Sequence, residues 1–232
     1  DAMHRGVVGT TTAMVCCPDG LSTIPRYAEP IRGRVGLHLQ LTDGRPRLPA
    51  EDVPSLVDGA GGFPRRRAAV RSTNAAEVAR EWRAQLAALR ALGIEPTHLD
   101  SHHHVHLLPQ VFDVFAELAR EEGLPARAGS PRARNLLRAH GVACADHFSE
   151  RFEGNRTGVD DLLRMLADAT QLVADGELLE VMCHPARPDE KLAQRSSYVT
   201  DRQRELETLL EPDLDHRFDA LGFRLVRGPR DE

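Results

Sequence analysis

The chain has 232 residues, enough for one sizeable α/β core, and we expect a single domain over residues 1–232. Lys and Arg number 30 against 35 Asp and Glu, so the net charge of −5 offers no basic surface for nucleic acid. No apolar run reaches the ~18 residues of a membrane span. Without a membrane span or a signal-peptide pattern at the start, we expect no membrane partner and a cytoplasmic location.

Short apolar or β-branched runs alternate with amphipathic stretches along the chain. In chain order we expect a strand over 7–15, a strand over 34–41, a Gly-, Pro- and Arg-rich excursion over 43–73, a helix over 75–92, a strand over 97–102, a helix over 109–122, a short strand over 124–128, a helix near 133–140, a strand over 142–147, a helix over 159–174, a strand over 178–183, helices over 200–210 and 213–221, and a strand over 223–226. This alternation predicts right-handed βαβ units and a mainly parallel sheet.

Some helix ends carry their own signals. Asn74 is the expected N-cap of the 75–92 helix. Pro109 is expected to open the next helix and Gly123 to end it. Thr200 followed by Gln203 predicts a capping box for the helix over 200–210.

Five of the eleven histidines lie between residues 98 and 106, in the segment His-Leu-Asp-Ser-His-His-His-Val-His. Imidazoles suit Zn²⁺ and other divalent ions, and a cluster at a strand end favours a metal site over hydrogen-bonded or surface histidines. On an extended segment His102 and His104 would point one way and His103 the other. Five ligands are too many for one ion, so Asp100, His104 and His106 are candidates for contacts to the ligands or to substrate.

Two other histidines lie at predicted strands. His38 stands opposite the apolar face of the 34–41 strand. Taken alone it is more often an internal hydrogen-bonding residue, but a catalytic metal needs ligands from different strands. His184 follows the 178–183 strand and precedes Pro185, where a buried histidine is an equally good interpretation. A hydrolase that releases an amine needs a general acid, and histidine suits that role near neutral pH.

Three motifs in this order resemble the YdjC-like carbohydrate deacetylases, most closely those acting on chitooligosaccharides: Gly-Leu-His-Leu-Gln-Leu-Thr at 36–42, Thr-His-Leu-Asp-Ser-His-His-His-Val-His at 97–106, and Glu-Val-Met-Cys-His-Pro at 180–185. The resemblance implies a deformed (β/α) TIM-like barrel, a divalent metal (Mg²⁺ or Zn²⁺), an N-acetylated sugar substrate and a homodimer by analogy. By position, His38 and His102 match the family's metal ligands, and His184 is assigned as the acid. Tyr198 and Arg202 resemble its C-terminal segment and are candidates for substrate or structural contacts.

The family's first strand ends in Ala-Asp-Asp-Phe-Gly, whose aspartates supply a metal ligand and the base. The printed sequence begins downstream of that motif, so we expect the first barrel strand to be missing and the printed chain to have little activity. One alternative is a non-catalytic sugar- or metal-binding remnant. The other is a different metal-dependent hydrolase, such as a phosphoesterase, whose two-metal site would require more carboxylates near the histidines.

Overall fold

The computed structural model describes residues 1–228, apart from the side chains of Ala28, Glu29 and Arg195. These residues form two compact units, a larger one of residues 10–144 and a smaller one of residues 1–9 and 145–227. Each unit has its own cluster of buried hydrophobic side chains. No helix within residues 1–228 is long and apolar enough to cross a membrane.

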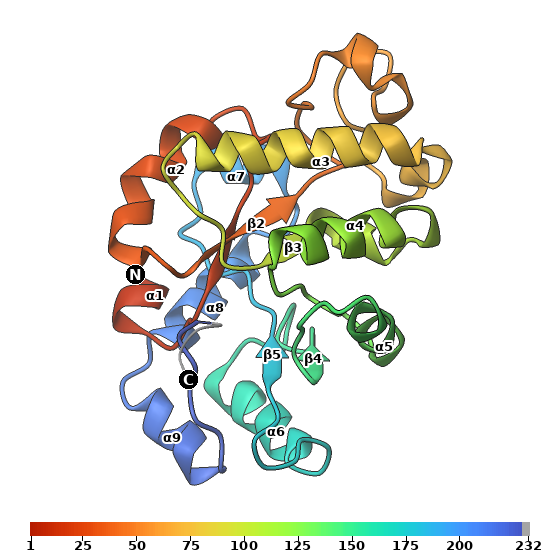
Figure 1. Cartoon of the computed structure of the whole chain (residues 1–232). Helices are drawn as coiled ribbons and strands as arrows, with labels where there is room; N and C mark the ends of the chain where they lie inside the picture. The colour runs from red at the N-terminus through yellow and green to blue at the C-terminus, as the bar shows by residue number, and fades with distance from the viewer. Residues whose placement is uncertain (229–232) are drawn as a thin grey trace. The chain divides into compact units, whose positions relative to one another are not determined.

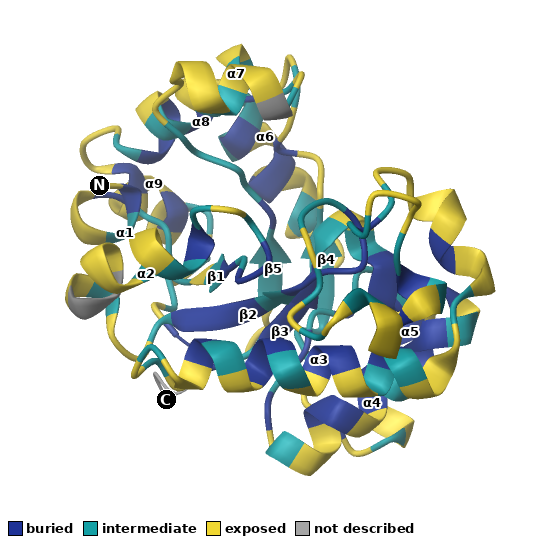
Figure 2. Ribbon diagram, turned by 90° about the horizontal axis from the view of Figure 1, so that it is seen from above, coloured by how far each residue is buried: buried dark blue, intermediate teal, exposed yellow. Residues whose placement is uncertain are grey.

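The sheet of the larger unit has three parallel strands in the order β1 (Thr11–Ala13), β2 (Val35–Leu39) and β3 (Leu99–Ser101). A helix lies between consecutive strands in the chain, α2 (Gly20–Ala28) before β2 and α3 (Ala75–Arg90) before β3. Each helix carries the chain back to the starting edge, which is why the strands run parallel. Figure 2 shows β2 buried, in agreement with its pattern of four buried residues out of five.

Helix α3 begins where its sequence predicts. The side chain of Asn74 accepts hydrogen bonds from the backbone amides of Ala76 and Glu77, which confirms the predicted N-cap. Helix α4 (Pro109–Glu122) likewise ends at Gly123, whose φ of 63° is the left-handed conformation that glycine adopts readily. The two helices pack against each other, and α3 also packs against β2 (Figure 1). The apolar side chains along one face of α3 are buried: Val78, Trp82, Leu86 and Leu89.

Short helical turns occupy the predicted excursion. They are the 3₁₀ helices η2 (Ala50–Asp52), η3 (Pro54–Leu56) and η4 (Arg67–Ser72), and another, η1 (Glu29–Ile31), follows α2. The histidine segment forms η5 (His102–Leu107), and α5 (Pro131–Ala139) ends the helices of the larger unit.

The smaller unit contains a parallel pair of strands, β4 (His147–Ser149) and β5 (Leu179–Val181). Its helices are α1 (Ala2–Arg5), α6 (Val159–Ala169), α7 (Glu190–Arg195), α8 (Thr200–Leu209) and α9 (Leu214–Ala220). Buried side chains from α1, α6, α8 and α9 form its core, together with Phe152.

A mixed α/β architecture with parallel strands is therefore confirmed. The strands of residues 1–228 form sheets of three and two, and no barrel closes among them. The strand predicted over 223–226 is wrong, and β4 lies later than the predicted 142–147, because alternation of apolar residues does not specify which backbone partner a segment finds. The capping box at Thr200 is also wrong: Val199 is the N-cap, and the side chain of Gln203 donates to Glu207.

Candidate functional site

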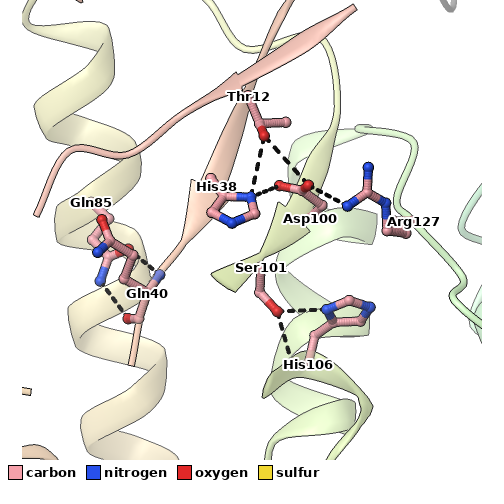
Figure 3. A network of polar contacts seen from close by, with 8 residues as sticks. All are labelled: Thr12, His38, Gln40, Gln85, Asp100, Ser101, His106 and Arg127. Carbon is pink, nitrogen blue, oxygen red and sulfur yellow. Dashed lines mark hydrogen bonds and ion pairs between the residues drawn. The ribbon is translucent and has the colours of Figure 1, made fainter. Parts of the chain in front are cut away.

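The ring of His38 is oriented by neighbours on adjacent strands. β2 pairs with β3 so that His38 stands opposite Asp100. The Nδ1 atom of His38 lies 2.6 Å from Oδ1 of Asp100 and 3.2 Å from the hydroxyl of Thr12 on β1 (Figure 3). With Nδ1 engaged, Nε2 is the ring atom left for another ligand, which is the usual arrangement of metal-binding histidines.

Asp100 is buried, with only 2% of its side chain exposed, and its other oxygen meets a cation. Oδ2 lies 2.8 Å from the guanidinium of Arg127. Burial by itself raises the pKa of a carboxyl group, but the nearby His38 and Arg127 outweigh it and hold the pKa of Asp100 below its usual range. Asp100 is therefore an ionised carboxylate that orients His38, and it is a poor proton acceptor for catalysis.

The chain turns sharply directly after β3. His102 opens the 3₁₀ helix η5, and both His103 and His104 have left-handed backbones, with φ of 53° and 49°. The expectation that these side chains alternate as on a strand is wrong, because the extended backbone ends at Ser101. Two consecutive non-glycine residues in this region are strained, and such strain is found mainly at functional sites.

The turn places three side chains around one point. Ligand atoms of Asp43, His102 and His103 all lie within 4.8 Å of one another. Oδ2 of Asp43 is 3.3 Å from Nε2 of His102, and the rings of His102 and His103 stack with centroids 3.9 Å apart. The hydroxyl of Thr42 lies 3.0 Å from Nδ1 of His103. The ring of His38 is outside this group of three but lies 5.5 Å from that of His102, centroid to centroid.

Asp43 is positioned by a buried polar network that links its loop to α3. The backbone N–H of Gln40, next to the end of β2, donates to Oε1 of Gln85, and the side-chain amide of Gln85 donates back to the Gln40 carbonyl, each at 2.9 Å (Figure 3). The side-chain amide of Gln40 donates to the backbone carbonyl of Asp43 at 3.0 Å. Glu81 accepts from the backbone amides of Arg47 and Leu48 further along the loop.

His106 has a different environment from the histidines before it. It is fully buried, its Nδ1 lies 2.6 Å from the hydroxyl of Ser101, and its ring lies 4.6 Å from that of Phe115. Burial lowers the pKa of His106 to about 3, so the ring is neutral. The ring of His104 lies 6.0 Å from it.

The remaining predicted residues belong to the smaller unit. His184 follows β5, and its ring lies 6.1 Å from that of Tyr198. The guanidinium of Arg202 lies 5.5 Å from the centre of the Tyr198 ring. Glu205 is fully buried beside them, and burial raises its pKa.

Sequence reasoning thus named two groups of residues that the structure brings together: His38, Asp100 and His102 in one unit, and His184, Tyr198 and Arg202 in the other. It missed Asp43, Thr12 and Arg127, and it assigned Glu205 no role. A signal existed for Asp43, since Thr-Asp-Gly directly follows the strand of His38. Nothing in the sequence distinguished Arg127 from the chain's many other charged residues.

The comparisons with known proteins show the family. The profile of the family described as "YdjC-like protein" matches residues 1–220, and the chain belongs to that family. A carbohydrate deacetylase of Geobacillus stearothermophilus is 36% identical over 97% of this chain and 87% of its own length. A chitooligosaccharide deacetylase of Yersinia enterocolitica is 35% identical over 97% and 88%.

A solved structure agrees with this assignment. An Enterococcus faecalis protein described as a cellobiose-phosphate cleavage protein superposes with a TM-score of 0.86 at 33% identity, covering 97% of this chain and 88% of that one. The predicted family is confirmed, and the names of the first two relatives are those of hydrolytic enzymes acting on N-acetyl sugars, as the motifs predicted.

Proposed function

We propose that this protein is a metal-dependent deacetylase that hydrolyses the N-acetyl group of amino sugars, with chitooligosaccharides as the substrate class. The observation that carries the proposal is the pair formed by His38 on β2 and His102 directly after the neighbouring strand β3, with rings 5.5 Å apart, in a family of named carbohydrate deacetylases. Substrate class and activity follow from the names of the relatives.

The donor set fits a divalent ion. His102 and Asp43 offer a nitrogen and an oxygen at close range, His103 offers a second nitrogen, and His38 is oriented by Asp100 with its Nε2 available. Mixed imidazole and carboxylate donors suit Zn²⁺ better than Mg²⁺, which prefers oxygen. We infer that His38 and His102 hold the ion, with Asp43, whose Oδ2 lies 3.3 Å from Nε2 of His102, as the carboxylate donor.

Each residue then has a defined task. A divalent ion held by His38 and His102 would supply an activated water, by lowering the pKa of that water toward ~7, and positive charge for the acetamide oxygen. Asp100 keeps the His38 ring in one tautomer and orientation, and Arg127 keeps Asp100 ionised. His184 protonates the departing sugar amine, a step typically worth ~10²–10⁴ in rate.

Finer features follow by analogy with the family. We infer that the parallel strands are part of a deformed (β/α) barrel, which the 0.86 TM-score to a solved relative supports without defining closure. A homodimer is proposed on the family resemblance alone. The name of that solved relative mentions a sugar phosphate, so phosphorylated sugars belong among the substrates tested.

The test is acetate release from diacetylchitobiose and its phosphorylated form, by protein expressed from its complete reading frame and stripped of metal, then supplied with Zn²⁺, Co²⁺ or Mg²⁺. We expect turnover that requires added metal and falls with chelator. Metal binding without acetate release would favour a non-catalytic sugar- or metal-binding protein. Phosphate release from the phosphorylated sugar would favour a phosphoesterase.

A further inference from the structure

Glu205 is a fully buried carboxylate in the smaller unit. A buried carboxylate is strongly disfavoured unless its oxygens are paired or hydrogen-bonded. Within residues 1–228 no Lys or Arg forms an ion pair with it. Hydrogen bonds must therefore support its burial, and their donors identify the groups that Glu205 positions.

Both oxygens of Glu205 are used. Oε2 accepts the backbone N–H of His184, in a short hydrogen bond. Oε1 accepts the phenol of Tyr198 at 2.5 Å, and the phenol oxygen in turn accepts the backbone N–H of Gly154 at 2.9 Å. Hydrogen bonds to a charged acceptor are stronger than those between neutral groups, so this contact fixes the peptide that carries His184.

The other side of His184 is held from the same helix. Arg202 lies one turn before Glu205 on α8, and its Nη1 donates to the carbonyl of His184 at 3.3 Å. Its Nε donates to the carbonyl of Tyr198 at 2.8 Å. β5 ends at Val181, and Pro185 has no N–H to continue a ladder. Side chains from one turn of α8 thus bind both the N–H and the C=O of His184.

We propose that Glu205, together with Arg202, is a positioning residue for His184: it sets where the imidazole stands without touching substrate. The inference rests on the proposed function, in which His184 is the general acid. A group that transfers a proton must be held close to the atom it protonates, and a displacement of ~1 Å can cost ~10²-fold in rate.

A double-mutant cycle tests this role, using metal-loaded protein from the complete reading frame. Glu205→Gln, in an otherwise unchanged enzyme, is expected to lower kcat roughly 10- to 100-fold while KM stays near its original value. In a His184→Ala enzyme the same change is expected to cost no more than about twofold, since the group it positions is gone. Glu207→Gln, an exposed carboxylate on the same helix, is the matched control and should match the parent enzyme.

Several outcomes would overturn the inference. Equal losses in both backgrounds would mean a general structural role, and no loss in the parent enzyme would mean no role. If Glu205→Gln does not fold, Glu205→Asp, which keeps the charge but shortens the reach, takes its place. Amide hydrogen exchange at His184 gives a reading independent of activity and should accelerate in either variant. If the parent enzyme releases no acetate, the proposed function is wrong. If amide hydrogen exchange at His184 is unchanged in the Glu205 variants, Glu205 does not hold the His184 peptide, whatever the activity.

Discussion

His38 and His106 lie near the same sheet, yet their environments assign them opposite tasks. His38 is partly exposed, with 17% of its side chain accessible, and its Nδ1 meets a carboxylate that is itself held by Arg127. His106 is fully buried, its ring packs at a tilt against that of Phe115, and its Nδ1 is hydrogen-bonded to a neutral hydroxyl. The first arrangement orients the ring and keeps one ring nitrogen available, whereas the second keeps the ring neutral.

The difference shows that a histidine-rich motif is not a uniform ligand cluster. Residues on the turn after β3 contact Asp43 and Thr42, whereas the end of η5 packs into the core. Partners and burial, rather than residue type, separate the histidines proposed to bind metal from one that supports the fold. Substitutions of His38 or His102 should therefore affect metal binding and activity, and substitutions of His106 should affect stability. Equal effects from both kinds of variant would contradict this distinction.

The largest effect is expected at His102. Replacing it with alanine should weaken metal binding by more than roughly 100-fold, since substitutions of mere supporting residues already cost 10- to 100-fold. Zn²⁺ titration with a competing chelator measures the change. His140→Ala, a histidine at the end of α5 in the same unit, is the control and should bind as the parent does. Equal affinity in the His102 variant would remove it from the proposed ligand set.

The next effect concerns Asp100. Asp100→Asn keeps the shape but removes the charge that orients His38, so metal affinity or kcat/KM should fall roughly 10- to 100-fold. Comparison with Asp43→Asn shows which carboxylate is the ligand: loss of a ligand should lower metal affinity more than loss of an orienting group. A larger loss of affinity in the Asp100 variant would contradict the assignment of Asp43.

His106 should affect stability and its pH dependence instead of activity. Its folded pKa, about 3, lies below the ordinary value of 6.5, so the unfolded chain binds a proton that the folded chain does not. Its contribution to stability is present above pH 6.5 and is lost as pH falls toward 3. Urea unfolding of His106→Leu should show a shallower decline in this window, by up to about 1.4 kcal/mol per pH unit. The folded His106→Leu variant should retain a turnover close to that of the parent enzyme. If the stability of the variant and of the parent changed identically with pH, burial would not be the cause of the low pKa of His106.

The smallest effect on turnover is expected at Gly36 on β2. A β-carbon there would lie 2.5 Å from the carbonyl oxygen of His98 and 2.7 Å from its ring. Gly36→Ala should therefore destabilise the fold by about 1–3 kcal/mol through overpacking, with turnover of the folded protein unchanged. Gly59→Ala, which meets nothing within 4 Å, is the matched control in thermal unfolding. Equal melting temperatures for the two would show that the strands relax at no cost.

The sequence by itself determined the family, the alternation of strands and helices, and the helix ends at Asn74 and Gly123, because periodicity and capping are local properties. It also named His38, Asp100, His102 and His184 as residues of interest. These assignments depended on motifs whose spacing is written along the chain.

Only the tertiary structure decided how those residues are used. The pairing of β2 with β3 places Asp100 opposite His38, the loop after β2 brings Asp43 to His102, and α8 brings Glu205 to the peptide of His184. These partners lie 62, 59 and 21 residues apart in the chain. Contacts over such separations depend on strand register and helix packing, which the local pattern of residue types does not specify.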